Sequence, residues 1–255
     1  MIEPKNRKWV LSLQNISGIL VFFMEKSESI IRPKPLKNFS GEKVVYVPVD
    51  VPSGIIRKHL HQTASRAKTT EWGTFFQLDG KVVLYQAMGA PLAVMSLELL
   101  IASGAKEILL LGFCGSLNPG LKTASVVSVN RAYADEGTSR HYVPGRMYFH
   151  SSPAFQKAIE SDLSKRGLSW LRSTAVTTDA PFRETQAWLR TMQRKGCAVV
   201  DMETSAVFAL ASFRRIQAAA LLIVSDELSA EKWQEGFFDS GLEEKVRQYF
   251  LPFFR

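Results

Sequence analysis

Residues 198–228 read AVVDMETSAVFALASFRRIQAAALLIVSDEL and place an acidic residue shortly after each of two apolar runs. The first run, 198–200, leads to Glu203, and the second run, 218–224, leads to Asp226. The small-residue stretch between them has a helical pattern, so the simplest prediction is strand, helix, strand. In an open α/β sheet, ligands bind beyond the carboxyl ends of the strands. Glu203 and Asp226 are therefore predicted to point into one crevice, and two carboxylates there favour a reaction with a cationic transition state.

The rest of the chain repeats this alternation of strands and helices. Its 255 residues with 46% hydrophobic content are enough to bury a full core in one domain. We expect an α/β fold, a three-layer α/β/α sandwich with a central mixed sheet. The basic, proline-bearing stretch 32–37 interrupts regular structure. We therefore predict an N-terminal extension over residues 1–40 and a single domain over residues 41–255.

Local patterns give the expected elements. Apolar runs predict further strands, and helical periodicity followed by glycine or a basic residue predicts helices. Asp79-Gly80 is a good turn pair for a hairpin. The expected strands are 44–49, 74–78, 82–86, 107–111, 124–132 and 171–176, and the expected helices are 55–67, 92–103, 153–166, 185–195 and 242–250.

Charge and cysteine content limit the partners that we expect. The net charge of +8 comes from scattered basic residues, without the basic run or aromatic interleaving of a nucleic-acid surface. Cys114 and Cys197 lie far apart and form no Cys-x-x-Cys motif, so we expect no disulfide framework and no metal site. The apolar run 16–24 is too short to cross a membrane and lacks a cleavage site. We predict a cytoplasmic protein that binds neither membrane nor nucleic acid.

Several motifs occur in order along the chain: Gly-Ala-Pro at 89–91, Leu-Gly-Phe-Cys-Gly-Ser at 111–116, Glu-Gly-Thr-Ser at 136–139, Thr-Asp-Ala-Pro-Phe-Arg-Glu at 178–184, Asp-Met-Glu-Thr-Ser-Ala at 201–206 and Val-Ser-Asp at 224–226. Together these motifs resemble the nucleoside phosphorylase superfamily. This superfamily includes purine nucleoside phosphorylases, uridine phosphorylases and related nucleosidases. The resemblance runs from about Val44 to the C-terminus and implies cleavage of the N-glycosidic bond of a nucleoside, releasing base and ribose 1-phosphate by phosphorolysis.

The resemblance assigns the two acidic residues to the catalytic site. It implies that Glu203 accepts hydrogen bonds from the ribose hydroxyls, with Met202 packing on the sugar. An ionised carboxylate there would also stabilise a developing oxocarbenium ion. Asp226 corresponds to the aspartate that protonates purines at N7, which uridine phosphorylases generally lack, so a purine-type base is expected. The alternatives are a first-turn glutamate stabilised by the helix dipole and a capping aspartate.

Further residues are predicted to line the substrate site. In the resembled family an aromatic residue packs on the base, and Phe182 is the candidate. Arg183 either contacts the base or phosphate, or pairs with Glu184 or Asp179 on the surface. The glycine turn after the strand 107–111 lets the backbone approach a ligand closely. The remaining predicted substrate-binding residues are Phe113, Cys114, Gly115 and Ser225, with Cys114 as a packed thiol and not a nucleophile.

The usual phosphate-binding residues are not all present. Phosphorolytic members hold phosphate with a Gly-Asp-Pro-x-Arg loop, where this chain has Val-Asp-Val-Pro-Ser at 49–53. Leu110 and Phe113 stand where the family has charged or hydroxyl donors. Each lost charge-assisted hydrogen bond costs about 1.5–3 kcal/mol, so several losses weaken phosphate binding by orders of magnitude. The arginines that would rebuild the site are Arg57, Arg131, Arg140 and Arg183.

Two alternatives to phosphorolysis therefore stay open. One is a phosphate-independent nucleosidase, in which a carboxylate such as Glu25 activates water. The other is a non-catalytic nucleoside-binding homologue. The resemblance implies no organic cofactor, with inorganic phosphate as the co-substrate of a phosphorylase. It also implies a homo-oligomer, a dimer or a hexamer built from dimers.

Overall fold

The computed structural model describes residues 29–229 and 232–255. The chain divides into two compact units, 1–32 and 33–255, and all that follows concerns the second. Leu36 packs against the core and Phe39 is buried in it, so residues 33–40 belong to the second unit although the sequence placed them in an extension. Glu25 and the apolar run 16–24 lie outside the described residues. No helix in the described ranges is long and apolar enough to cross a membrane.

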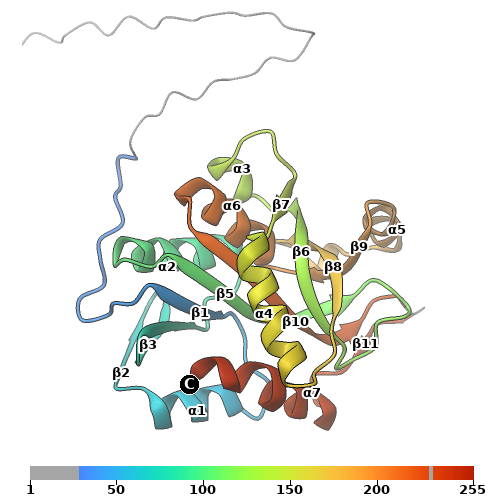
Figure 1. Ribbon diagram of the computed structural model, residues 1–255. Helices are drawn as coiled ribbons and strands as arrows, with labels where there is room; N and C mark the ends of the chain where they lie inside the picture. Colours follow the sequence, from blue (N-terminus) through green and yellow to red (C-terminus); the bar gives the residue numbers. More distant parts are fainter. Residues whose placement is uncertain (1–28, 230–231) are drawn as a thin grey trace, which may run out of the picture. The chain divides into compact units, whose positions relative to one another are not determined.

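A mixed, 11-stranded sheet forms the centre of the fold (Figure 1). Strands β1 (Lys43–Val47), β5 (Glu107–Ser116) and β10 (Gln217–Glu227) run parallel to one another, with β5 between the other two. The other strands are β2 (Arg66–Thr70), β3 (Gly73–Leu78), β4 (Lys81–Tyr85), β6 (Val126–Asp135), β7 (Tyr148–His150), β8 (Leu171–Thr178), β9 (Cys197–Asp201) and β11 (Gln234–Glu235).

Helices cover both faces of this sheet, which explains why its parallel strands are continuously apolar. Along β1, Val44 and Tyr46 face one buried cluster, whereas Val45 and Val47 face another. The first cluster includes the buried faces of α2 (Ala90–Ala102) and α6 (Thr204–Arg214), and the second includes those of α1 (Ile55–Thr63) and α4 (Pro153–Lys165). The predicted α/β fold with a central mixed sheet is confirmed. The shorter helices are α3 (Ser139–Tyr142), α5 (Gln186–Arg194) and α7 (Ser240–Lys245).

Part of the sheet closes on itself. Strand β10 pairs with both β5 and β6, and β6 pairs with β8. Strand β8 pairs with β9, which returns to pair with the end of β5. The strands β5, β10, β6, β8 and β9 therefore form a closed ring. The ring brings the end of β9, which leads to Glu203, and the end of β10, which carries Asp226, to either side of β5.

The structure differs from the sequence prediction at several elements. The helix expected over 55–67 ends at Thr63, because Ala64 adopts an extended conformation and Arg66 begins β2. Strand β2 is mostly exposed and pairs with β3, so it lacks the apolar run by which a strand is recognised. At the C-terminus, α7 ends at Lys245 and the chain continues as a π-helical turn over Val246–Phe250. The short elements α3, β7 and β11 were not predicted.

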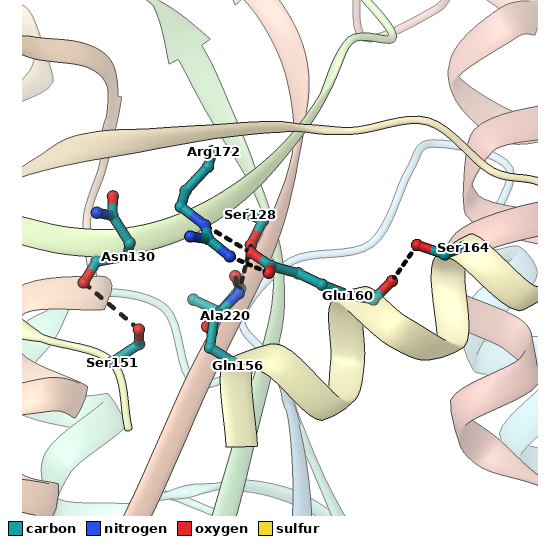
Figure 2. Close-up of polar contacts among 8 residues, drawn as sticks. All are labelled: Ser128, Asn130, Ser151, Gln156, Glu160, Ser164, Arg172 and Ala220. Atoms are coloured by element: carbon teal, nitrogen blue, oxygen red, sulfur yellow. Dashed lines mark hydrogen bonds and ion pairs between the residues drawn. The ribbon is translucent and has the colours of Figure 1, made fainter. Parts of the chain in front are cut away.

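A buried polar network attaches α4 to the sheet. Figure 2 shows Gln156 and Glu160 on α4 reaching Ser128 of β6 and Arg172 of β8. Ser128 Oγ donates to Glu160 Oε1 at 2.6 Å, and Arg172 Nε donates to the same oxygen at 3.0 Å. Burial raises the pKa of Glu160, but hydrogen bonds from Arg172 and Ser128 outweigh burial and leave the pKa below its ordinary value. This buried carboxylate is therefore ionised and paired.

Candidate active site

Strands β9 and β10, which lead to Glu203 and carry Asp226, both pair with β5 at Gly115. Gly115 pairs with Val200 of β9 on one side and with Asp226 of β10 on the other, next to a register shift in β10. A Cβ atom at Gly115 would lie 3.1 Å from Val200 Cγ1, 3.2 Å from Asp226 Oδ2 and 2.4 Å from Leu228 Cδ1. The absence of a side chain therefore lets Asp226 lie against the backbone of β5. Because β9 ends beside the same glycine, Glu203 reaches the same region.

A cavity of about 550 Å³ opens at this meeting point. Its volume falls within the range of small-molecule binding sites. Its walls are mainly apolar, and its acidic side chains are Asp50, Glu184, Asp201, Glu203 and Asp226. Within the described part of the chain, no lysine, arginine or histidine lines it. The cavity therefore offers hydrogen-bond acceptors and negative charge, and its own side chains provide no cation to hold an anion.

Glu203 lies immediately before α6 and is only 5% exposed. The backbone N–H of Gly89, just before α2, donates to Glu203 Oε1 at 2.7 Å. Burial raises the pKa of Glu203 to about 8, with a further contribution from the charge of Asp201. Its carboxyl group therefore holds a proton at higher pH than an exposed glutamate does, so its charge can change when a ligand binds.

Asp201 is a second buried carboxyl group beside Glu203. Thr177 Oγ1 donates to Asp201 Oδ1 at 2.7 Å, and the backbone N–H of Thr204 donates to Oδ2 at 2.8 Å. The Thr204 hydroxyl also donates to Oδ2. Burial raises the pKa of Asp201 despite these donors. Asp201 holds the start of α6 in place, and its charge disfavours ionisation of Glu203.

Asp226 has a hydrogen-bond partner at each carboxyl oxygen. The indole Nε1–H of Trp233 donates to Oδ2 at 2.8 Å, and the Ser225 hydroxyl lies 2.8 Å from Oδ1. An indole nitrogen can only donate, so Oδ2 must act as an acceptor. Asp226 is 9% exposed and borders the cavity. Its orientation is fixed before any ligand arrives.

Glu184 follows the 3₁₀ turn Pro181–Arg183 and lines the same cavity. Within the described residues its carboxyl group accepts no hydrogen bond. Burial raises the pKa of Glu184 to about 7, and the charge of Asp226 raises it as well. Glu184 is therefore a second titratable group on the Asp226 side of the cavity.

Comparison with known proteins places this chain in a family. The model of the Phosphorylase superfamily matches residues 57–251. The chain belongs to the Phosphorylase superfamily. A DeoD-type purine nucleoside phosphorylase of Caldanaerobacter subterraneus subsp. tengcongensis is 28% identical over 175 residues, which cover 63% of this chain and 73% of the relative. An uncharacterized protein of Acanthamoeba polyphaga mimivirus is 27% identical over 162 residues, which cover 62% of this chain and 63% of that protein.

Solved structures show the same fold at lower identity. Purine nucleoside phosphorylase from Toxoplasma gondii, in complex with immucillin-H, is 21% identical with a TM-score of 0.72, covering 89% of this chain and 94% of the other. AMP nucleosidase from Bacteroides thetaiotaomicron is 19% identical with a TM-score of 0.66, covering 82% of this chain and 87% of the other. The same fold thus occurs in a protein named as a phosphorylase and in one named as a nucleosidase.

Most of the residues that the sequence predicted for the substrate site line this one cavity. The cavity is lined by both predicted catalytic residues, Glu203 and Asp226, and by Met202, Phe182, Phe113, Cys114, Gly115 and Ser225. Phe182 borders it with a fully exposed side chain. Arg183, in contrast, is exposed and does not line the cavity. Burial raises the pKa of the Cys114 thiol well above its ordinary value, in keeping with a packed thiol.

The arginines considered for phosphate also lie away from the cavity lining. The guanidinium of Arg131 lies 4.7 Å from the centroid of the Tyr148 ring, and Arg140 is exposed on α3. Asp50 uses its carboxylate to accept from the backbone N–H of Arg57 at 3.0 Å. It also accepts from the Tyr85 hydroxyl at 3.1 Å. The loop after β1 is thus stabilised by an acidic side chain at the cavity wall.

The sequence analysis did not identify three contributors to the site. Glu184 was noted as a partner for Arg183, although it stands two residues after Phe182 in a recognised motif. Asp201 is the first residue of another motif and was not singled out. Trp233 lies in no motif, and its contact with Asp226 depends on the path of the chain after β10. In the described ranges, no group of three or more His, Cys, Asp or Glu residues is arranged to hold a metal ion.

Proposed function

We propose that this protein cleaves the N-glycosidic bond of a purine-type nucleoside, releasing the free base. The observation that carries the proposal is that Glu203 and Asp226, from the ends of β9 and β10, line one cavity. Cleavage of this bond leaves positive charge on the ribose and negative charge on the base. A site with one carboxyl group for the sugar and another for the base meets both requirements.

At the sugar end, Glu203 is the proposed ribose-binding residue and Met202 packs on the sugar. In its ionised form, Glu203 accepts hydrogen bonds from ribose hydroxyls and stabilises the developing oxocarbenium ion. The burial of Glu203 strengthens both interactions, because the effective dielectric constant is low there. Its pKa of about 8 means that substrate binding must favour the carboxylate.

At the base end, Asp226 is proposed to hold the base and Phe182 to pack on it. The departing base needs a proton, and family resemblance assigns this step to Asp226. The DeoD-type relatives are named as purine nucleoside phosphorylases, which supports a purine-type base. Phe113, Cys114, Gly115 and Ser225 complete the proposed binding surface, whereas Arg183 contacts the substrate only if the loop 181–186 moves.

The nucleophile is either phosphate or water. The names of the curated relatives favour phosphorolysis, with ribose 1-phosphate as the second product. The lining of the cavity favours hydrolysis, because none of its described residues is basic. A phosphate ion among several carboxyl groups would need cations from elsewhere. We propose that the chain forms a homo-oligomer, and a neighbouring copy is one source of such cations.

Free-base release from a panel of purine and pyrimidine nucleosides, with and without phosphate, tests the proposal. We expect release from a purine nucleoside and a large loss of rate in Asp226→Asn. Release that depends on phosphate would establish phosphorolysis, and release without phosphate would establish hydrolysis. Nucleoside binding without any release would instead identify a non-catalytic homologue. Light scattering of the same preparation measures the oligomeric state.

A further inference from the structure

Two aromatic rings of the cavity wall have no part in the proposed contacts with ribose and base. Trp233 and Phe237 follow β10 in the chain, and both line the cavity. Trp233 is 57% exposed and Phe237 is 37% exposed, although aromatic side chains gain most when their surface leaves water. Exposed apolar surface that gathers at a cavity marks a binding site for an apolar group. The two rings therefore offer uncovered apolar surface at the edge of the cavity.

Both rings are fixed to the sheet. Strand β11 (Gln234–Glu235), which lies between them in the chain, pairs antiparallel with the end of β10. A Cβ atom at Gly236 would lie 2.6 Å from a backbone oxygen of β10, so the chain before Phe237 packs directly on that strand. The indole N–H of Trp233 donates to Asp226, and the two aromatic rings meet edge-on with their centroids 6.5 Å apart. The exposed apolar surface is thus a preformed wall.

This wall lies at the base end of the cavity. Asp226 is proposed to hold the base, and Trp233 contacts the same carboxyl group. Leu228, two residues after Asp226, adds another apolar side chain to the lining. The rim of an unsubstituted purine carries only hydrogen atoms and amino or oxo groups, so it would leave the two rings in contact with water. An apolar group on the rim of the base would cover them.

We propose that Trp233 and Phe237 form a subsite for an apolar substituent on the base. The favoured substrates are then purine-type nucleosides that carry an alkyl or aryl group on the exocyclic nitrogen. This inference rests on the proposed function, because it requires a nucleoside in the cavity with its base at Asp226. Contact between the substituent and the rings removes apolar surface of both from water. It requires no change in the bonds that hold the ribose.

A panel of adenosine derivatives tests the subsite through kcat/KM for base release and through Kd measured by calorimetry. We expect kcat/KM for N6-benzyladenosine to exceed that for adenosine about tenfold or more. N6-propyladenosine and N6-(2-hydroxyethyl)adenosine have equal numbers of non-hydrogen atoms and differ only in a terminal methyl or hydroxyl group. The propyl compound should be favoured over the hydroxyethyl compound about fivefold, because only the methyl group gains from leaving water.

Variants locate the gain on the two rings. The ratio of kcat/KM for N6-benzyladenosine to that for adenosine is taken within each variant, so that a general loss of activity cancels. We expect Phe237→Ala and Trp233→Ala each to lower this ratio about three- to tenfold. Phe238→Ala is the matched control, because Phe238 is the next residue and is 84% exposed but is not among the described residues that line the cavity. Its ratio should equal that of the wild type.

The outcomes separate this inference from the proposed function. A wild-type ratio of one or less, or equal rates for the propyl and hydroxyethyl compounds, would overturn the subsite and leave glycosidic cleavage intact. A gain that persists in both alanine variants would also overturn it, because another surface, such as a second copy of the chain, would then hold the substituent. If the wild type releases no base, the proposed cleavage fails, and the same ratios of Kd still decide the subsite. Absence of binding to every compound would overturn both.

Discussion

Glu160 and Glu203 are the same residue type at the same exposure, 5%, in two regions of one sheet. Glu160 accepts hydrogen bonds from Arg172 and Ser128 and has a lowered pKa (Figure 2). Glu203 accepts a backbone N–H from Gly89, lies beside Asp201, and has a raised pKa. The first carboxylate is fully partnered within the protein. The second retains acceptor capacity for a group that the protein does not contain.

This difference separates a buried charge that serves the fold from one that serves a ligand. Buried charges are normally paired, because an unpaired one costs several kcal/mol or titrates to its neutral form. Burial raises the pKa of Glu203 and of Glu184, which favours their neutral forms. Such destabilising groups persist in proteins mainly at functional sites. We therefore expect replacement of glutamate by glutamine to have opposite effects on stability and activity at Glu203 and at Glu160.

The largest expected effect is the loss of activity in Glu203→Gln. Because the ribose contact and the charge opposite the oxocarbenium ion are both lost, we expect kcat/KM for base release to fall about 10³-fold or more. The variant should nevertheless be at least as stable as the wild type. The raised pKa of Glu203 makes the native state bind its proton more tightly, so wild-type stability falls as pH rises from its unfolded value near 4.5 toward 8.

Urea unfolding at two pH values measures that stability. At pH 9 we expect Glu203→Gln to be about 1–3 kcal/mol more stable than the wild type, and at pH 4 we expect no difference. Lower stability of the variant at both pH values would show that Glu203 supports the fold as Glu160 does, and the comparison would fail.

Gly115→Ala tests whether activity depends on the position of the Asp226 carboxyl group, because the substitution leaves Asp226 itself unchanged. The new Cβ would lie 2.4 Å from Leu228 Cδ1 and 3.2 Å from Asp226 Oδ2, so both side chains must shift. We expect an activity loss of about 10–100-fold together with a stability loss of about 1–3 kcal/mol. Gly112→Ala is the matched control on β5, where the new Cβ would lie 3.2 Å from Leu222 Cδ2. It should lower stability without a comparable loss of activity, and equal activity losses would contradict the prediction.

Glu160→Gln is the counterpart of the first substitution. It removes the charge that Arg172 and Ser128 stabilise, so we expect a stability loss of about 1–2 kcal/mol at pH 7, limited because Arg172 is partly exposed to solvent. The lowered pKa means that this contribution is present above about pH 4.5 and is lost as pH falls through the native value. Base release should change less than about threefold. A gain in stability at pH 7 would remove the contrast with Glu203.

The smallest expected effect is that of Trp233→Phe. The substitution keeps a ring but removes the N–H that orients Asp226, so we expect kcat to fall about 3–10-fold with little change in stability. Steady-state kinetics with a purine nucleoside measure the loss, and Phe237→Leu is the control for packing, because Phe237 stacks edge-on against Trp233. An equal loss in both variants would show that packing, and not the N–H donor, matters.

The layered fold could be predicted from the sequence because its central strands are buried on both faces. Runs such as 218–224 are apolar at consecutive positions, and their two alternating sets face two different clusters in the structure. The hairpin at Asp79-Gly80 was also predicted correctly, because Gly80 has the positive φ that such a turn requires. Strand β2 was missed because its residues are mostly exposed and its partner strand alone defines it.

The site could be predicted where residues lie near the ends of strands or in a recognised motif. Glu203 and Asp226 follow apolar runs, so topology alone suggested that they meet. The surroundings of Glu184 and the contact of Trp233 with Asp226 depend on how two loops fold over the cavity, which local patterns do not encode. Arg183 was predicted for the site by its position in a motif, but it ends the 3₁₀ turn Pro181–Arg183 and does not line the cavity.

The closed ring of β5, β10, β6, β8 and β9 affects how readily backbone hydrogen bonds open in the native state. These five strands have no free edge within the ring, so we expect the hydrogen bonds between β5 and β10 to open less readily than those of an edge strand. We expect the amide protons of β5 and β10 to be among the slowest to exchange with deuterium. Access to the cavity must then come from its loop side, through the segments that carry Phe182 and Trp233.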